Sequence, residues 1–127
     1  MPSQNTREYG AQAELYTANW LKEQGYIILD RNYYIRGGEI DIIAQKDDTV
    51  VFVEVRSWER QFWDGGTPME TIGPSKIKHI IKTALFYIQE KRVCLQTYNI
   101  RFDVAALIKT PSGGWDIDYL EAAFDVN

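Results

Sequence analysis

Two short apolar segments, each interrupted by one acidic residue, constrain this chain more than any other feature. Residues 38–44 read Gly-Glu-Ile-Asp-Ile-Ile-Ala, and residues 50–56 read Val-Val-Phe-Val-Glu-Val-Arg. Both are rich in the β-branched and aromatic residues that favour strands, and the polar segment 46–49 between them contains turn-forming aspartates. We therefore predict an antiparallel β-hairpin over residues 38–56.

The predicted hairpin places two carboxylates opposite each other. When Gln45 faces Val50, Asp41 faces Glu54, and this holds for a loop of either two or four residues. Directly opposed side chains have Cβ atoms about 4.5–5.5 Å apart, a separation at which like charges are destabilising. A cation would remove this repulsion, and carboxylate ligands suit Mg²⁺ or Mn²⁺. The alternative is that each acid pairs with a nearby Arg or Lys at a sheet edge.

Length and composition narrow the class of protein. The 127 residues are 45% hydrophobic and 25% charged, which predicts one soluble domain spanning residues 1–127. The net charge of −4 argues against a generally basic nucleic-acid-binding protein. A single cysteine, a polar N-terminus and the lack of a run of about 20 apolar residues predict a cytoplasmic protein outside the membrane.

The order of predicted elements is helix, three strands, helix, strand, strand. The first helix runs from residue 5 or 6 to about residue 24, and Glu14 falls inside its apolar stripe of Ala11, Leu15, Ala18 and Leu21. A carboxylate on such a face needs a partner or a function, although a glutamate at the stripe edge could also reach solvent or an arginine. The other predictions are strands at residues 26–32, 98–108 and 115–119 and a helix starting at Pro74.

Two segments carry candidate nucleic-acid contacts. The long segment 57–72 contains Trp58, Arg60, Phe62 and Trp63, and aromatic side chains beside arginine can stack on unpaired bases. Such aromatics more often pin a loop to the core or form an oligomer contact. The second helix carries Lys76, Lys78 and Lys82, which could contact phosphates or simply face solvent.

Four motifs together resemble the small, largely uncharacterised YraN-like family of bacteria. They are Gly10-x-x-x-Glu14, Gly38-Glu39-Ile40-Asp41, Val51-Phe52-Val53-Glu54-Val55 and Arg101-Phe102-Asp103-Val104. That family is similar to the restriction-endonuclease-like (PD-(D/E)xK) superfamily, and within it to archaeal Holliday-junction resolvases. The resemblance implies an α/β fold with an α-β-β-β-α-β core, in which a mixed central sheet is flanked by helices.

The resemblance also implies a catalytic site. By position, Asp41, Glu54 and Arg56 would occupy the superfamily's Asp and Glu-x-Lys positions, and Glu14 its helical glutamate. Asp41 and Glu54 would be the metal ligands. This chain has Arg56 where the family usually has lysine, and Trp58 where it commonly has arginine. Arginine stays protonated and cannot act as a base, although it can bind a phosphate, so a lysine at position 56 is expected to increase cleavage.

Two classes of function follow from these residues. The first is a Mg²⁺- or Mn²⁺-dependent endonuclease acting on DNA, including branched or structured DNA. The second is a catalytically inactive nuclease-fold module that binds nucleic acid or a protein partner. The opposed carboxylates favour the first class, whereas Arg56 and the acidic net charge favour the second. A homodimer is compatible with either class.

Overall fold

The computed structural model describes residues 6–60 and 68–126. The helices in these ranges are α1 (Thr6–Glu23), a short 3₁₀ helix η2 (Pro68–Thr71) and α2 (Pro74–Glu90). The strands are β1 (Ile27–Ile35), β2 (Gly38–Lys46), β3 (Thr49–Glu59), β4 (Asn99–Lys109) and β5 (Trp115–Phe124). The predicted order of helix, three strands, helix and two strands is confirmed for this part of the chain.

One mixed sheet organises the molecule, with its strands in the order β1-β2-β3-β4-β5. The pairs β1–β2, β2–β3 and β4–β5 are antiparallel, while β3 and β4 are parallel along the full length of β3. Parallel strands need a long connection, and here α2 lies within it. The predicted mixed sheet is therefore present, and its parallel pair sits at its centre.

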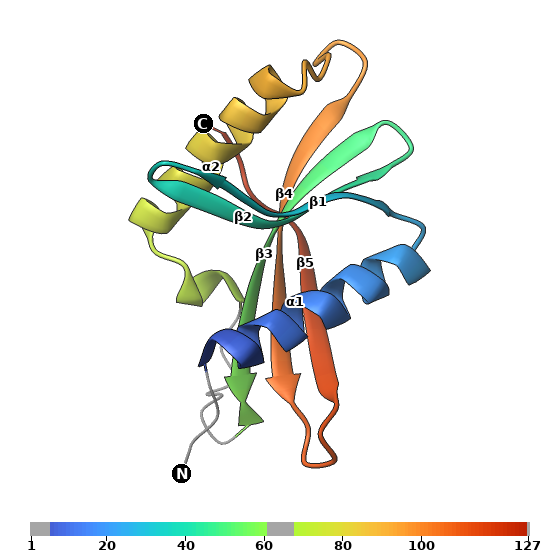
Figure 1. Ribbon diagram of the computed structural model, residues 1–127, viewed down its shortest axis with the longest axis vertical. Coiled ribbons are helices and arrows are strands. Elements are labelled where there is room, and N and C mark those ends of the chain that lie inside the picture. Colours follow the sequence, from blue (N-terminus) through green and yellow to red (C-terminus); the bar gives the residue numbers. More distant parts are fainter. Residues whose placement is uncertain (1–5, 61–67, 127) are drawn as a thin grey trace.

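The two helices cover opposite faces of the sheet (Figure 1). On one face, Ala13, Ala18 and Leu21 of α1 pack on alternate residues of β2, β3 and β4. On the other face, α2 packs on the residues between them, including Ile43 and Phe52. None of the described helices has the length and apolar character needed to cross a membrane.

Three details of the sequence prediction were wrong. Residues 33–35, expected to be a connection, extend β1 to Ile35. The buried face of α1 is formed by Ala13, Thr17, Ala18 and Leu21, and Leu15 is 51% exposed. The third detail is the segment 57–72, which was expected to be one loop. In the structure β3 continues to Glu59, and η2 forms residues 68–71. Phe62 and Trp63 lie outside the described residues.

Gly38 allows α2 to approach β2 closely. A Cβ atom built on Gly38 would overlap the hydroxyl of Thr83 and lie 3.1 Å from the carbonyl oxygen of His79. Thr83 is fully buried and donates a 2.6 Å hydrogen bond to that same carbonyl. A larger residue at position 38 would therefore push α2 away from the sheet, together with the side chains at its N-terminal end.

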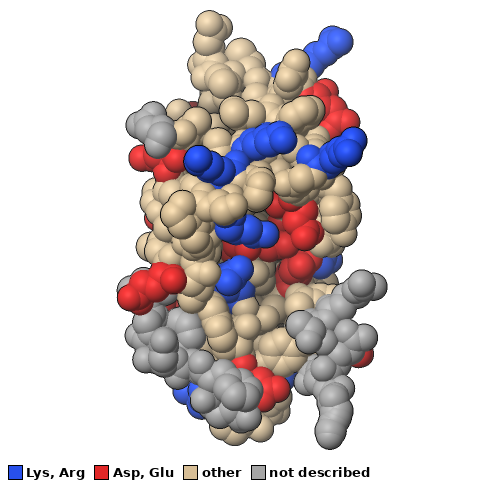
Figure 2. Space-filling view, turned by 90° about the vertical axis from the view of Figure 1, so that its left-hand side faces the viewer, with Lys and Arg blue, Asp and Glu red and all other residues tan. Residues whose placement is uncertain are grey.

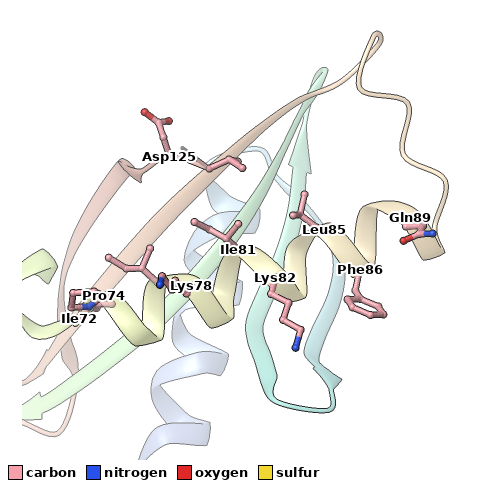
Figure 3. Close-up of a pocket in the computed structure, with 11 residues that line it drawn as sticks. Ile72, Pro74, Lys78, Ile81, Lys82, Leu85, Phe86, Gln89 and Asp125 are labelled. Atoms are coloured by element: carbon pink, nitrogen blue, oxygen red, sulfur yellow. The ribbon is translucent and has the colours of Figure 1, made fainter.

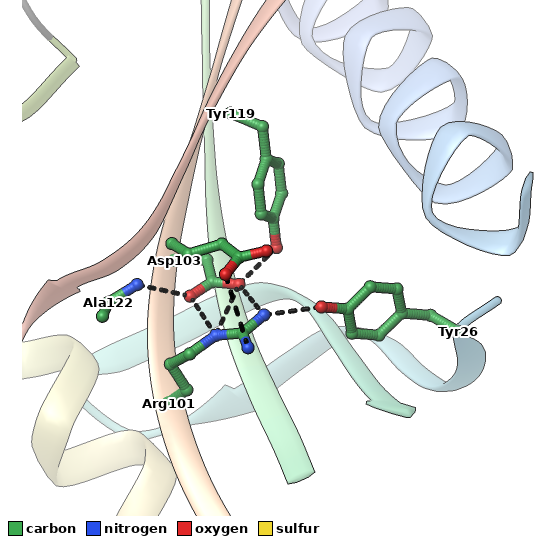
Figure 4. A network of polar contacts seen from close by, with 6 residues as sticks. Tyr26, Arg101, Asp103, Tyr119 and Ala122 are labelled. Carbon is green, nitrogen blue, oxygen red and sulfur yellow. Dashed lines mark hydrogen bonds and ion pairs between the residues drawn. The ribbon is translucent and has the colours of Figure 1, made fainter. Parts of the chain in front are cut away.

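A buried ion pair joins β4 to β5 and to the start of β1. Asp103 is 1% exposed and accepts hydrogen bonds from Arg101 Nε at 2.9 Å, Tyr119 Oη at 2.6 Å and the Ala122 backbone N–H at 3.0 Å. Arg101 Nη2 also donates to the Tyr26 hydroxyl at 2.6 Å (Figure 4). We call these residues the Asp103 network. Both carboxylate oxygens of Asp103 accept hydrogen bonds from groups in it.

Candidate active site

The strands β2 and β3 separate at Asp41. Their pairing runs from Lys46–Thr49 to Ile42–Val53 in the predicted register, whereas β1 stays paired with β2 as far as Gly38. Beyond Ile42, β2 therefore leaves β3 and follows β1 toward α2 (Figure 1). The Val55 backbone N–H donates a 2.8 Å hydrogen bond to Asp41 Oδ2. We call Asp41, Glu54 and Val55 the strand fork.

The two carboxyl groups of the strand fork are buried and in contact. Asp41 is 9% exposed and Glu54 is 5% exposed, and their carboxyl groups share a hydrogen bond. Burial, followed by the charge of Asp41, raises the pKa of Glu54 to about 8. Burial also raises the pKa of Asp41, although the hydrogen bond from Val55 opposes this. The pair therefore holds a proton at neutral pH, since two adjacent carboxylates cannot both be ionised without a cation.

Two basic side chains approach Glu54 from different elements. Lys76 Nζ, at the start of α2, lies 3.7 Å from Glu54 Oε2. Arg56 Nη1, from β3 itself, lies 3.5 Å from the same oxygen. The guanidinium of Arg56 is also held by a 2.9 Å hydrogen bond from Nη2 to the carbonyl oxygen of Thr71. A lysine thus reaches the acidic pair from α2, although the strand position carries arginine.

Glu14 approaches the strand fork from the opposite side, on α1. Its side chain is 18% exposed, lies 4.0 Å from Arg31 Nη2 and is hydrogen-bonded to the side chain of Asn32. Burial and then the charge of Asp41 raise the pKa of Glu14 to about 7. Glu14 therefore has the arginine neighbour that the first alternative expects, and its functional role stays a prediction.

Figure 2 shows the face of the molecule on which these groups gather. Acidic side chains occupy the middle of this face, and basic side chains lie beside and above them. Glu39 adds to the negative field, because its charge raises the pKa values of both Asp41 and Glu14. The site therefore combines buried acids with cations at its margin.

The structure brings together five of the predicted site residues and separates the others. Glu14, Asp41, Glu54, Arg56 and Lys76 form the electrostatically coupled site described above. Arg60 follows Glu54 by six residues, which corresponds to about 20 Å in an extended chain. Its Nη2 forms an ion pair with Asp116 Oδ2 at 2.6 Å. Trp58, on the same stretch, is half-buried at a position paired with Ile108 of β4.

Lys78 and Lys82 belong to a different surface feature. Both line an apolar groove of about 710 Å³ on the outer side of α2, beside Ile81, Leu85 and Phe86 (Figure 3). The apolar residues at helical spacing in this segment (Ile77, Ile80, Ile81, Ala84, Leu85 and Ile88) predict one buried face, yet Leu85 is 45% exposed in the groove. Lys82 Nζ also extends toward the turn at Gly37, so of these two lysines Lys82 is the better placed to reach the strand fork.

Sequence reasoning missed two residues around the site, Arg31 and Tyr34, and assigned no site role to Glu39, which lies two residues before Asp41 on the same strand. Arg31 and Tyr34 lie on β1, and Tyr34 pairs with Glu39 across the β1–β2 turn. The available signal was Gly37, because a turn residue with a φ of 92° is most readily a glycine. Reading that turn correctly would have extended β1 and placed Tyr34 beside the acids.

The strand fork offers two carboxylate ligands to a divalent cation, so waters or a substrate would have to supply the other ligands. Among the described residues, no three His, Cys, Asp or Glu side chains are arranged to hold a metal ion together. Asp41 and Glu54 alone supply two carboxylates, and Mg²⁺ commonly binds one or two carboxylates together with waters and a substrate phosphate. The shared proton of this pair supports the fit, because a cation would replace it.

Comparison with known proteins assigns the family. Residues 13–107 match the uncharacterised protein family UPF0102. The chain belongs to UPF0102. A UPF0102 protein of Syntrophus aciditrophicus is 46% identical over 124 residues, covering 98% of this chain and 93% of the relative. A UPF0102 protein of Dictyoglomus turgidum is 40% identical over 123 residues, covering 94% and 99% of the two chains.

Membership of UPF0102 confirms the resemblance to the YraN-like family. The matched residues 13–107 include Glu14, the strand fork, Arg56 and Lys76, so the whole candidate site lies inside the region that defines the family. The whole of β5 lies beyond residue 107 and is outside that region.

Proposed function

We propose that this UPF0102 protein is a metal-dependent endonuclease of the restriction-endonuclease-like type, acting on DNA that includes branched or structured forms. The observation that carries the proposal is the pair of buried, adjacent carboxyl groups at the strand fork with Lys76 and Arg56 within 4 Å of Glu54. Glu54 has two basic partners, as the structural alternative also requires, whereas Asp41 has no ion-pair partner within 4 Å among the described residues and, besides its contact with Glu54, accepts only the Val55 N–H hydrogen bond. A cation shared by the two carboxylates would neutralise Asp41 as well.

The proposed cofactor is Mg²⁺ or Mn²⁺, held by Asp41 and Glu54. When bound, such a cation supplies charge neutralisation for a phosphodiester and a more acidic water. The backbone N–H of Val55 fixes the orientation of the Asp41 carboxylate through its 2.8 Å hydrogen bond. The strand fork therefore pre-positions one ligand through the backbone, which favours reproducible geometry at the reacting phosphate.

The basic residues have separate proposed roles. Lys76, with its side chain 38% exposed, can direct its ammonium to a phosphate oxygen or to a water. Arg56 is tethered to Thr71 and can stabilise developing negative charge from a fixed position. Because Lys76 already provides an ammonium beside Glu54, this chain does not require lysine at position 56.

Glu14 is the proposed proton acceptor or donor. Its pKa of about 7 gives it comparable protonated and ionised populations near neutral pH, which is the range in which general acid–base catalysis is most effective. Its hydrogen bond to Asn32 and its ion pair with Arg31 hold the carboxyl group toward Asp41.

The experiment that tests the proposal is a cleavage assay on single-stranded, duplex and four-way-junction DNA with Mg²⁺, Mn²⁺ or EDTA. We expect metal-dependent cleavage that Asp41→Asn and Glu54→Gln abolish and that Lys76→Ala lowers about 10²-fold. Arg56→Lys is expected to change the rate less than about tenfold, because Lys76 already supplies the ammonium. Asp48→Asn, at an exposed turn acid, is the matched control and should cleave normally.

The second candidate is a non-catalytic module that binds nucleic acid or a protein partner. Arg56 at the usual lysine position and the net charge of −4 favour it. DNA binding that weakens steeply with salt, without cleavage of any substrate in either metal, would support this function over the nuclease. Absence of both binding and cleavage would favour a protein partner.

A further inference from the structure

Two hollows lie beside the acidic site and share two residues. The α1-side hollow, of about 610 Å³, includes Gly10, Glu14, Arg31, Asn32, Tyr34 and Glu39. The α2-side hollow, of about 310 Å³, includes Tyr34, Gly37, Gly38, Glu39, Lys76 and His79. Both volumes fall in the range of small-ligand sites. Tyr34 and Glu39 form the divide between them, so any chain-like ligand crossing the site passes Tyr34.

Tyr34 is an aromatic side chain without a structural role in the described part of the protein. It is 70% exposed, and it makes no hydrogen bond or ring contact with another described residue. Its neighbour Tyr33 is the opposite case, since it donates a 2.6 Å hydrogen bond to Glu90 and packs edge-on against Tyr87. What sets Tyr34 apart from other exposed apolar side chains is its position, because it lines both hollows beside the acidic site and its ring is accessible to a ligand there.

Each hollow also offers a cation to a phosphate. Arg31 lines the α1-side hollow, and its Nε is buried without a hydrogen-bond partner among the described residues. Lys76 lines the α2-side hollow and reaches Glu54. The Arg31 side chain is 35% exposed, and its only ion pair among the described residues is a 4.0 Å contact with Glu14, so its guanidinium can also contact a phosphate in this hollow.

We propose that Tyr34 is a stacking platform for an unpaired nucleobase and that the two hollows receive the nucleotides on either side of it. The substrate class is therefore single-stranded or locally unpaired nucleic acid. This inference rests on the proposed function for the position of the phosphate, beside Glu54 and Lys76. In a duplex, the base faces are stacked within the helix and cannot cover the Tyr34 ring, whereas every unpaired base presents such a face.

The test measures binding to protein carrying Glu54→Gln, so that cleavage does not interfere. The probe is a short single-stranded DNA containing 2-aminopurine, compared with the same sequence as a duplex. Tyr34→Ala is expected to weaken single-strand binding by roughly 10- to 100-fold and to abolish quenching of the 2-aminopurine fluorescence. Tyr34→Phe and Tyr34→Trp should retain both, because stacking needs the ring and not the hydroxyl.

The matched control is Tyr16→Ala, an exposed tyrosine of α1 that lies two residues from Glu14 and so about 200° around the helix. It should leave binding unchanged. A loss that is equal on duplex and single strand, or no loss in Tyr34→Ala, overturns the inference. Arg31→Gln should reduce the slope of affinity against salt concentration, whereas Tyr34→Ala should leave that slope unchanged.

The nuclease and the stacking platform can fail separately. If the native protein cleaves nothing but Tyr34→Ala still loses single-strand binding, the platform is supported and the nuclease is excluded. If the native protein cleaves DNA and Tyr34→Ala keeps both its single-strand affinity and its 2-aminopurine quenching, the platform is excluded and the nuclease is retained. Absence of any binding to single strands at low salt overturns the platform directly.

Discussion

The sheet carries two buried acidic centres that are built in opposite ways. Asp103 accepts hydrogen bonds from three groups on β4 and β5, and its guanidinium partner is itself held by Tyr26. Asp41 and Glu54 receive one backbone hydrogen bond and otherwise face each other, with basic side chains no closer than 3.5 Å. The first centre is fully hydrogen-bonded by groups of the chain, whereas at the second the Asp41 carboxyl group accepts one backbone hydrogen bond and Glu54 has two basic side chains at 3.5 and 3.7 Å.

This difference separates a structural acid from a candidate functional one. Burial alone does not distinguish them, because Asp103 and Glu54 are both almost inaccessible. What distinguishes them is whether donors satisfy the charged form. At the strand fork they do not, and the pKa values of the acids rise.

The largest expected effect is the difference in the free energy of unfolding between Asp103→Asn and Asp41→Asn, which each replace one buried carboxylate by an amide. Asp103→Asn should lower the free energy of unfolding by about 3 kcal/mol, because it leaves Arg101 and the other donors without their acceptor. Asp41→Asn in metal-free buffer should be neutral or stabilising, since it relieves the repulsion with Glu54. Urea unfolding of both variants measures this. A loss of similar size in Asp41→Asn would mean that the strand fork is a structural ion pair.

The pH dependence of stability is expected to come from the strand fork and Glu14. Their folded-state pKa values, about 8 for Glu54 and about 7 for Glu14, lie above the ordinary value of 4.5, so the native state binds more protons between these limits. The stabilisation that these protonated groups provide is then fully present below about pH 4.5 and is lost as the pH rises toward 8.

Glu54→Gln tests this assignment of the pH dependence. Thermal unfolding of the native protein in EDTA should give a melting temperature that falls from pH 5 to pH 8. The variant should show a flatter profile, because it removes the group with the highest folded-state pKa among these acids. A native melting temperature that rises over the same interval would contradict the proton sharing at the strand fork.

Binding of Mn²⁺ at the strand fork should stabilise the folded protein, and this gain should not depend on the Asp103 network. At pH 8, a Mn²⁺ concentration about ten times the dissociation constant should add about 1.4 kcal/mol to the free energy of unfolding. Asp41→Asn should remove this gain and the calorimetric heat of Mn²⁺ binding. Tyr119→Phe, which removes one donor from the Asp103 network, should retain both effects. Equal binding heats in the native protein and Asp41→Asn would exclude the metal site.

The smallest expected effect is the change in the free energy of unfolding when the basic partner of the strand fork, Lys76, is removed. Lys76→Ala should change the free energy of unfolding by less than about 1 kcal/mol, because its ammonium is 3.7 Å from Glu54 and its side chain is 38% exposed. The cost of Arg101→Ala should be clearly larger, since it removes three hydrogen bonds to a fully buried carboxylate. Urea unfolding of the two variants compares them. Comparable losses would show that Lys76 is a structural partner.

The sequence predicted the centre of the fold well and its periphery less well. Alternation of apolar residues and the turn at residues 46–49 were enough to set the β2–β3 register as far as Ile42 and Val53. The separation of the strands at Asp41 could not be read from that pattern, because it depends on the Asp41 side chain accepting the Val55 N–H. Local alternation describes a regular ladder and gives no information about where the ladder ends.

The candidate site was predictable only in part, for a similar reason. Asp41 and Glu54 share one hairpin, so their proximity follows from local register. Lys76 reaches Glu54 only because α2 packs closely on β2 at Gly38, a contact between distant parts of the chain. Lys78 has the same residue type and nearly the same position in sequence, yet it faces the outer groove. The rotation of α2 about its own axis relative to the sheet determines which of these two lysines faces Glu54. Sequence spacing does not specify that rotation.

The parallel pairing of β3 with β4 also has a consequence for the order of folding. The β1–β2–β3 meander involves short connections, whereas the parallel pair forms only after α2 has crossed over and β4 has docked. We therefore expect the acids of the strand fork to assemble early and Lys76 to arrive late. Pulsed hydrogen exchange during refolding should protect β2 amides before those of β4, and simultaneous protection would contradict this order. A growing chain on the ribosome would then carry paired acids but lack the complete candidate site until β4 has been synthesised.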